Sequence, residues 1–297
     1  YAAMLTKLLL IAQANHAIMA SLRLGGGTVM AVARETELYP PIKNFFASRG
    51  YEVKSEVRGC DLVAIHPAEP EPTIVEMKKT FTLPLLLQGI DRQQTGAKVW
   101  LAVERNRAKK GAHSQRFHDL TSLCRRLRLG LMTVTFYKTK SPVIEVWCEP
   151  ETLFRSARAA SGNSDPDPDA TAIGQERPTP RMRKAAARLR KEFDGRSGDY
   201  NLGGSSRRKL VTAYRERSLL CAMALRVHGP SAPRNIREWT GCANAGAILR
   251  DNYYGWFVRV QKGVYQLTPS GEQALREYNE IVAQLAARLT WASAVQP

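Results

Sequence analysis

The sequence lacks the residue patterns that define several large classes of enzyme and metalloprotein. Its five cysteines are scattered, and none stands in a CxxC pair or a Cys/His cluster with zinc spacing, so a structural zinc site is not expected. The motifs GxxxxGK[ST], HExxH and GxSxG are also absent, which disfavours a P-loop NTPase, a zinc peptidase and a serine hydrolase. An odd number of cysteines without a disulfide framework predicts reduced thiols and a cytoplasmic protein.

Long apolar runs are missing as well. No stretch approaches the roughly 20 apolar residues that a membrane span needs, and the apolar run at residues 8–12 is too short even for a signal peptide. We expect residues 1–33 to form an extension outside the folded part, with residues 1–29 translated from upstream sequence and Met30 as the natural start. Mass spectrometry of the native N-terminus tests this, and peptides from residues 1–29 would contradict it.

Acidic residues are few relative to basic ones. Lys and Arg number 44 against 27 Asp and Glu, which gives a net charge of +17. Residues 181–217 alone hold 12 basic and 4 acidic residues. Such a balance favours a polyanionic partner, because phosphate neutralisation releases condensed counterions. The sequence therefore predicts nucleic acid, in particular DNA, as the partner; a merely solvated charged helix at residues 181–193 is the alternative.

The chain predicts an α/β domain over residues 34–155, with a mixed sheet flanked by helices. Hydrophobic periodicity and the positions of Gly and Pro give an α-β-β-β-α-β-α-β-β order. The expected helices are residues 38–49, 82–95 and 114–127, and the expected strands are residues 51–57, 60–66, 73–78, 98–103, 130–136 and 143–147.

A second unit is predicted after a linker. Residues 156–180 are rich in Pro, Asp and Ser and predict a disordered linker. A basic helical neck over residues 181–208 follows, in which the Gly/Ser turn before Arg207, Arg208 and Lys209 opens a helix whose free amides can bind phosphate. Three helices and a hairpin within residues 209–290 have the order of a winged helix, and residues 263–271 resemble its GxYxLTxxG wing segment. The expected DNA contacts are Asn244, Arg250 and Asn252 on the third helix and Arg259 and Lys262 on the wing.

The two strands at residues 60–66 and 73–78 carry the charged residues of most interest. If residues 67–72 form the loop, paired numbers sum to 139, so that Asp61 faces Lys78 and Glu76 lies diagonally from Asp61 on the same face. A register slip of one residue would turn Asp61 to the other face. Two carboxylates there can bind one hard cation such as Mg²⁺, with Lys78 beside the reacting phosphate. A plain salt bridge of Lys78 with either carboxylate is the alternative interpretation.

The pattern GCD at residues 59–61 and VEMK at residues 75–78 resembles the D…(D/E)xK core of the PD-(D/E)XK nuclease superfamily. Longer segments resemble a bacterial family of PD-(D/E)XK-type phosphodiesterases across about residues 34–280, most clearly in residues 35–65, 75–92, 203–215 and 247–257. The resemblance implies a restriction-endonuclease-like fold. It also implies metal ligation by Asp61, Glu76 and the Met77 carbonyl, with Lys78 as the catalytic lysine.

Members of that superfamily often add a glutamate from the first helix and a glutamine from the helix after the ExK strand. Glu35 and Glu37 are the candidates for the first, with Glu35 preferred, and Gln88 is the candidate for the second. Arg92, one turn beyond Gln88, is a further candidate for contacting the nucleic-acid backbone, although Asp91 is an alternative partner for it. The implied cofactor is Mg²⁺ or Mn²⁺.

Three functions compete on this sequence. The first is a metal-dependent nuclease delivered to DNA by a winged helix. The second is a non-catalytic DNA-binding regulator whose nuclease-like domain is only a scaffold, and the third is an assembly protein that uses the winged helix for protein contacts. The intact set of Asp61, Glu76 and Lys78 favours the first. The oligomeric state is left open, a homodimer included.

Overall fold

The computed structural model describes residues 29–69, 71–106, 115–151, 179–203 and 210–291. Its N-terminal part has the predicted α-β-β-β-α-β-α-β-β order, after a short 3-10 helix η1. The elements are η1 (Glu35–Leu38), α2 (Tyr39–Ala47), β2 (Glu52–Val57), β3 (Cys60–Ile65), β4 (Thr73–Lys78), α3 (Leu83–Gln93), β5 (Lys98–Glu104), α4 (Phe117–Arg126), β6 (Gly130–Tyr137) and β7 (Val143–Cys148).

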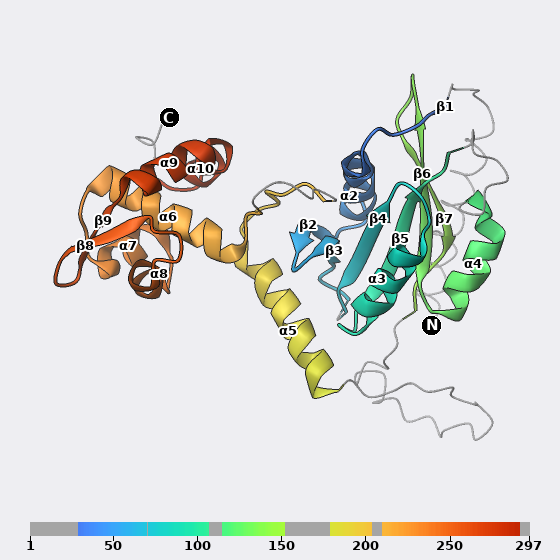
Figure 1. The fold of residues 1–297 in the computed structure, drawn as a ribbon, viewed down its shortest axis with the longest axis horizontal. Coiled ribbons are helices and arrows are strands. Elements are labelled where there is room, and N and C mark those ends of the chain that lie inside the picture. Colours follow the sequence, from blue (N-terminus) through green and yellow to red (C-terminus); the bar gives the residue numbers. More distant parts are fainter. Residues whose placement is uncertain (1–28, 70, 107–114, 152–178, 204–209, 292–297) are drawn as a thin grey trace, which may run out of the picture.

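These strands and β1 (Val29–Met30) form one mixed sheet of seven strands in the order β1-β6-β5-β4-β3-β2, with β7 also beside β6. The neighbours β4, β5 and β6 are parallel, and the other pairs are antiparallel. Both faces are buried: α3 and α4 pack on one, and α2 packs on the other (Figure 1). The predicted mixed sheet flanked by helices is confirmed.

The boundary expected at residue 34 falls inside the fold. Val29 and Met30 pair with Tyr137 and Phe136 of β6. Val32 is buried, and its backbone amide donates a hydrogen bond to Glu104 at 3.0 Å. The expectation that residues 1–33 all precede the fold is therefore wrong for residues 29–33, because β6 offers an edge that this segment covers. Residues 1–28 lie outside the described part.

The β3–β4 hairpin is shifted by two residues from the predicted register. Leu62 pairs with Val75, and Ala64 pairs with Thr73, so paired numbers sum to 137. The difference arises at His66, which starts the turn rather than pairing: its carbonyl accepts from the Glu69 amide and its Nδ1 accepts from the Ala68 amide. Because side chains alternate with a period of two, this shift leaves every residue on its predicted face.

The predicted basic helix is present as α5 (Pro180–Gly195). Thr179 caps it by accepting from the Met182 amide, and Phe193 packs into the sheet core from its last turn. Arg196 follows and is almost fully buried, where its guanidinium donates to the carbonyls of Ser55 and Glu56 on β2. One cation of the basic neck is thus structural, because these carbonyls take the place of solvent. The predicted linker lies almost wholly outside the described residues, which resume at residue 179.

The helix expected to open at the Gly/Ser turn begins later. In the structure α6 (Ala213–His228) starts after Thr212, whose hydroxyl accepts from the Arg215 amide, and residues 210–212 are not helical. The start of α6 therefore lies at Thr212 and not at the Gly/Ser turn, of which residues 204–206 lie outside the described residues. A better cap at Thr212 accounts for the difference. Arg207, Arg208 and Lys209 lie outside the described residues.

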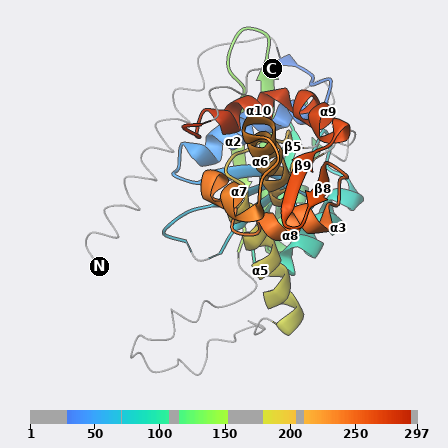
Figure 2. The ribbon, with the colours of Figure 1, turned by 90° about the vertical axis from the view of Figure 1, so that its left-hand side faces the viewer.

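The C-terminal elements share one hydrophobic core. They are α6, α7 (Pro233–Thr240), α8 (Ala245–Asp251), the hairpin β8 (Phe257–Gln261) and β9 (Val264–Leu267), α9 (Pro269–Glu277) and α10 (Asn279–Ala286). Figure 2 shows them grouped together in front of the sheet. The last helical stretch is broken at Tyr278, which is buried between α9 and α10. Among the helices described, none is both long and apolar enough to cross a membrane.

Candidate metal site

Asp61 and Glu76 lie opposite each other on β3 and β4. Continuing the register by one residue beyond Leu62 and Val75 places Asp61 directly across from Glu76, closer than the predicted diagonal relation. The Asp61 carboxylate accepts a hydrogen bond from the Met77 amide at 2.8 Å. The Asp61 side chain therefore takes the place of a backbone acceptor where the ladder ends.

Burial and mutual repulsion act on this pair of carboxylates. Glu76 is only 1% exposed. Burial first, and then the charge of Asp61, raise the pKa of Glu76 to about 7, although Arg92 acts in the opposite direction. Burial also raises the pKa of Asp61, against the hydrogen bond from Met77 and the charge of Lys78. Two carboxylates that disfavour each other's charge in this way suit a site for a divalent cation, which favours the charged form of both.

The Met77 carbonyl can contribute a third oxygen. On an extended strand the amide and the carbonyl of one residue point toward the same neighbouring strand, and the Met77 amide points at Asp61. Within the described residues, no three His, Cys, Asp or Glu side chains are grouped to hold a metal. The donor set at this place is therefore two carboxylates and a backbone carbonyl, which fits Mg²⁺ because that ion usually keeps several of its waters.

Lys78 lies on the same face as Glu76 and pairs with Glu35 of η1. Its Nζ is 3.3 Å from the Glu35 carboxylate. Glu37 instead accepts from the backbone amides of Ala33 and Arg34 at 3.0 and 2.8 Å. The geometry therefore favours Glu35 over Glu37 as the glutamate of the site. The alternative salt bridge of Lys78 with Asp61 or Glu76 is not what forms.

Arg92 occupies a different place from the one predicted. Its Nε is 2.6 Å from the Glu76 carboxylate, and its Nη2 donates to the Gly59 carbonyl. Arg92 is thus a cation inside the site, because α3 crosses β4 at this point. It is neither a partner of Asp91 nor a fully exposed side chain. Gln88, one turn earlier, is exposed on α3, and its predicted contact with the nucleic-acid backbone stays a prediction.

A segment that no sequence pattern predicts supports the site from the opposite face of the sheet. Asp199 accepts hydrogen bonds from the Tyr39 hydroxyl at 2.5 Å, from Lys43 at 2.6 Å, and from the Ser55 amide and hydroxyl at 2.8 Å. Four residues on, Gly203 lies against the Asp61 backbone. No local pattern marks Asp199, because all its partners are distant in the sequence.

Gly203 leads to a testable prediction. An added Cβ would lie 2.7 Å from the Asp61 carbonyl oxygen and 2.8 Å from the Met77 Cε, both closer than real contacts allow. We therefore expect Gly203→Ala to destabilise the protein by about 1–3 kcal/mol, measured as a lower urea midpoint. Gly246→Ala is the matched control, since its nearest atom would be at an ordinary 3.6 Å. Equal midpoints for the two variants would contradict the close approach.

The predicted DNA contacts of the C-terminal part differ in exposure. Asn244, Arg250, Arg259 and Lys262 are all exposed, and Arg250 forms an ion pair with its neighbour Asp251 at 3.0 Å. Asn252 was predicted to contact DNA, but its side chain is bonded within the protein instead. Its side chain donates to the Phe257 carbonyl and accepts from the Phe257 amide, and its φ of 43° ends α8 in the left-handed region. Asn252 therefore has a structural role as the α8 cap.

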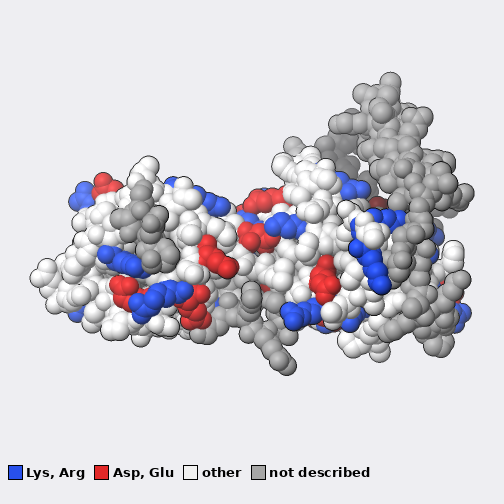
Figure 3. Space-filling view, turned by 90° about the horizontal axis from the view of Figure 1, so that it is seen from above, with Lys and Arg blue, Asp and Glu red and all other residues white. Residues whose placement is uncertain are grey.

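Charge is distributed unevenly. On the face drawn in Figure 3, Lys and Arg are intermixed with Asp and Glu, so the net charge of +17 is not gathered there. Exposed cations are more numerous along α5, where Arg181, Arg183, Lys184, Arg188 and Lys191 all face solvent.

A mixed sheet that brings two carboxylates and a lysine together on adjoining strands fits the PD-(D/E)XK class of phosphodiesterases. Residues 132–274 match the model of a family described as "Putative PD-(D/E)XK phosphodiesterase (DUF2161)". This match confirms the resemblance seen in the sequence and supports a nuclease-like hydrolase. The matched residues run from β6 into α9, so they do not include Asp61, Glu76 or Lys78. No curated protein and no solved structure matches the chain.

Proposed function

We propose that this protein is a metal-dependent nuclease that hydrolyses DNA at Asp61, Glu76 and Lys78. The observation that carries the proposal is the placement of Asp61 opposite a buried Glu76, with Lys78 two residues further on the same face. Asp61, Glu76 and the Met77 carbonyl would hold Mg²⁺ or Mn²⁺. When bound, such an ion polarises a phosphoryl oxygen and lowers the pKa of water.

The surrounding side chains have distinct tasks in this proposal. Lys78 supplies positive charge where negative charge develops on the phosphoryl group, and Glu35 holds its Nζ in position. Arg92 holds the Glu76 carboxylate through the 2.6 Å ion pair. Gln88 is exposed on the same helix and can contact the nucleic-acid backbone. Lys78 lies on β4, and the other three come from η1 and α3, which flank β4, so the site is built on secondary structure.

The C-terminal part would deliver DNA to this site as a winged helix. In that role α8 is the recognition helix, with Asn244 and Arg250 toward the bases, and the β8–β9 hairpin is the wing, with Arg259 and Lys262 toward phosphates. The order α6, α7, α8, β8 and β9 supports the proposal, as does the exposure of Arg250, whose side chain is 71% accessible. The exposed cations of α5 add phosphate contacts.

Cleavage assays test the proposed activity. Supercoiled and branched DNA would be incubated with the full chain and Mg²⁺ or Mn²⁺, with EDTA as the control. We expect nicking or cleavage by the wild type and none by Asp61→Asn, since a neutral amide is a poorer ligand for a hard cation. DNA that is bound but never cut would favour the non-catalytic regulator instead.

The proposed wing leads to a separate prediction about the salt dependence of DNA binding. Arg259→Ala and Lys262→Ala should each weaken DNA binding uniformly across sequences and reduce the slope of log K against log salt by about one. Fluorescence anisotropy over a range of salt concentrations measures this slope. Arg276→Ala is the control, because Arg276 is exposed on α9, outside the proposed wing. If the slope of log K against log salt stays at the wild-type value in both variants, the wing does not contact DNA phosphates.

A further inference from the structure

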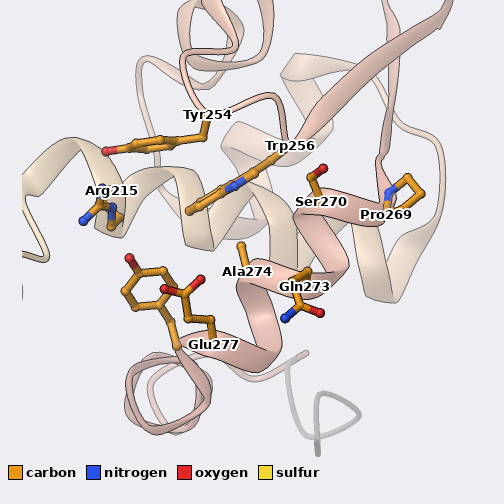
Figure 4. Close-up of a pocket in the computed structure, with 9 residues that line it drawn as sticks. Arg215, Tyr254, Trp256, Pro269, Ser270, Gln273, Ala274 and Glu277 are labelled. Carbon is orange, nitrogen blue, oxygen red and sulfur yellow. The ribbon is translucent and has the colours of Figure 1, made fainter. Parts of the chain in front are cut away.

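A cavity of about 520 Å³ lies in the C-terminal part, away from the candidate metal site. Arg215 from α6, Tyr254 and Trp256 from the loop after α8, and residues of α9 line it (Figure 4). Its volume falls within the range of about 300–1,000 Å³ typical of small-molecule sites. The proposed nuclease chemistry makes no use of it.

Two aromatic rings form one side of this cavity. Tyr254 and Trp256 stack on each other, with ring centroids 4.6 Å apart and planes at 28°. In Figure 4 these two rings lie on one side of the space, and Ala274 on α9 lies on the other. Tyr278 lines it as well. Because these rings cover one face of each other and Trp256 is only 7% exposed, a flat aromatic group would contact the outer face of the stacked pair.

Arg215 is the cation among the residues that line the cavity, and Glu277 is the carboxylate. Its Cζ is 4.9 Å from the centroid of Tyr254 and 5.6 Å from that of Tyr278, so the guanidinium lies near both rings. One of its nitrogens donates to the Leu210 carbonyl, which fixes the side chain. The planar guanidinium attracts a phosphate, which it can bind through two parallel N–H···O hydrogen bonds.

The polar rim matches the edge of a base. Ser270 and Gln273 line the cavity from the exposed side of α9. A hydroxyl and a carboxamide offer both donors and acceptors, which are the groups that a base presents on its edges. An aromatic wall, one cation, one carboxylate and a mixed polar rim thus occur together in a space of suitable size.

We propose that this cavity binds one nucleotide, with its base against Tyr254 and Trp256 and its phosphate at Arg215. The nucleotide is either a free one or an unpaired one within a single strand. A base inside a duplex cannot enter, since it is paired and stacked on both sides. The proposal goes beyond the nuclease proposal and does not depend on it.

Binding by the wild type is the first arm of the test. Labelled single-stranded oligodeoxyadenylate, an abasic oligonucleotide of the same length and free AMP would be titrated in EDTA, so that cleavage plays no part. We expect the base-containing strand to bind about tenfold more tightly than the abasic strand, or AMP to bind by calorimetry. The first result assigns the cavity to a strand and the second to a free nucleotide. Equal binding of both strands together with no AMP binding would overturn the proposal.

Variants localise the effect. Tyr254→Leu and Arg215→Met should each weaken binding of the favoured probe about tenfold. Arg226→Met is the matched control, because Arg226 is on the same helix but does not line the cavity. Wild-type affinity in both cavity variants would overturn the proposal. The nuclease proposal is tested separately. It fails if the wild type binds DNA but does not cut it in the presence of Mg²⁺ or Mn²⁺.

Discussion

Replacing Lys78 by alanine is expected to lower the rate of metal-dependent DNA cleavage by about 10²–10³-fold. Lys78 is the side chain on β4 whose charge lies beside the two carboxylates, and it contributes to the pKa of Asp61. Its own position is fixed by Glu35 at 3.3 Å. Because it is partly exposed at the end of a strand, its removal should cost little stability. Single-turnover cleavage at saturating Mg²⁺ or Mn²⁺ measures the effect.

The next residue in the chain provides the control. Lys79 is also a lysine, and its Nζ donates to the Ala33 carbonyl at 3.2 Å. Lys79 follows the last residue of β4 and bonds the Ala33 carbonyl rather than Glu35, so Lys79→Ala should retain cleavage within a few-fold of wild type. Equal losses in the two variants would mean that Lys78 has no special place in the reaction.

Replacing Asp199 by alanine is expected to lower the free energy of unfolding by about 3 kcal/mol. The variant would leave Lys43, the Tyr39 hydroxyl and Ser55 without their shared acceptor in a half-buried position. Urea unfolding followed by circular dichroism measures the loss. Asp194→Ala is the control, because the Asp194 side chain is 55% exposed and its ion pair with Arg190 should contribute less than about 1 kcal/mol. A similar loss in both variants would contradict the role of Asp199.

Asp199 also predicts a pH dependence. Burial raises its pKa, but hydrogen bonds from Lys43, Tyr39 and Ser55 outweigh burial and hold it below its ordinary value. A lowered pKa in the folded state means that the stabilisation is complete above the unfolded pKa of about 3.9 and is lost as the pH falls through the folded value. The wild type should therefore lose more stability on acidification than Asp199→Asn. Parallel urea midpoints of the two proteins below about pH 4 would contradict this.

The order of elements and the faces of the strands could be predicted from the sequence because both depend on local periodicity. The β3–β4 register could not, since the turn starts at His66 rather than at Pro67. Asp61 and Glu76 are nevertheless neighbours on one face of the sheet, as predicted. A shift of two residues leaves both side chains on the same face and brings the two carboxylates opposite each other. A shift of one would have separated them.

The contacts around the site depend on tertiary structure and lay outside the reach of sequence patterns. Arg92 pairs with Glu76 because α3 crosses β4, and the spacing of charges along α3 alone pointed instead to solvent or to Asp91. The partners of Asp199 lie more than 140 positions away in the sequence. Residues that pack across such distances carry no periodic signal, so a basic segment such as the one around Arg196 looked like a solvated neck.

A crystal structure of the protein with Mn²⁺ would test the central claim most directly, because the anomalous signal locates the ion. The proposed function predicts one Mn²⁺ bound by the carboxylates of Asp61 and Glu76 and by the Met77 carbonyl, with Lys78 on the same side of the sheet. An ion bound elsewhere, or Glu76 still paired only with Arg92 at saturating Mn²⁺, would contradict it.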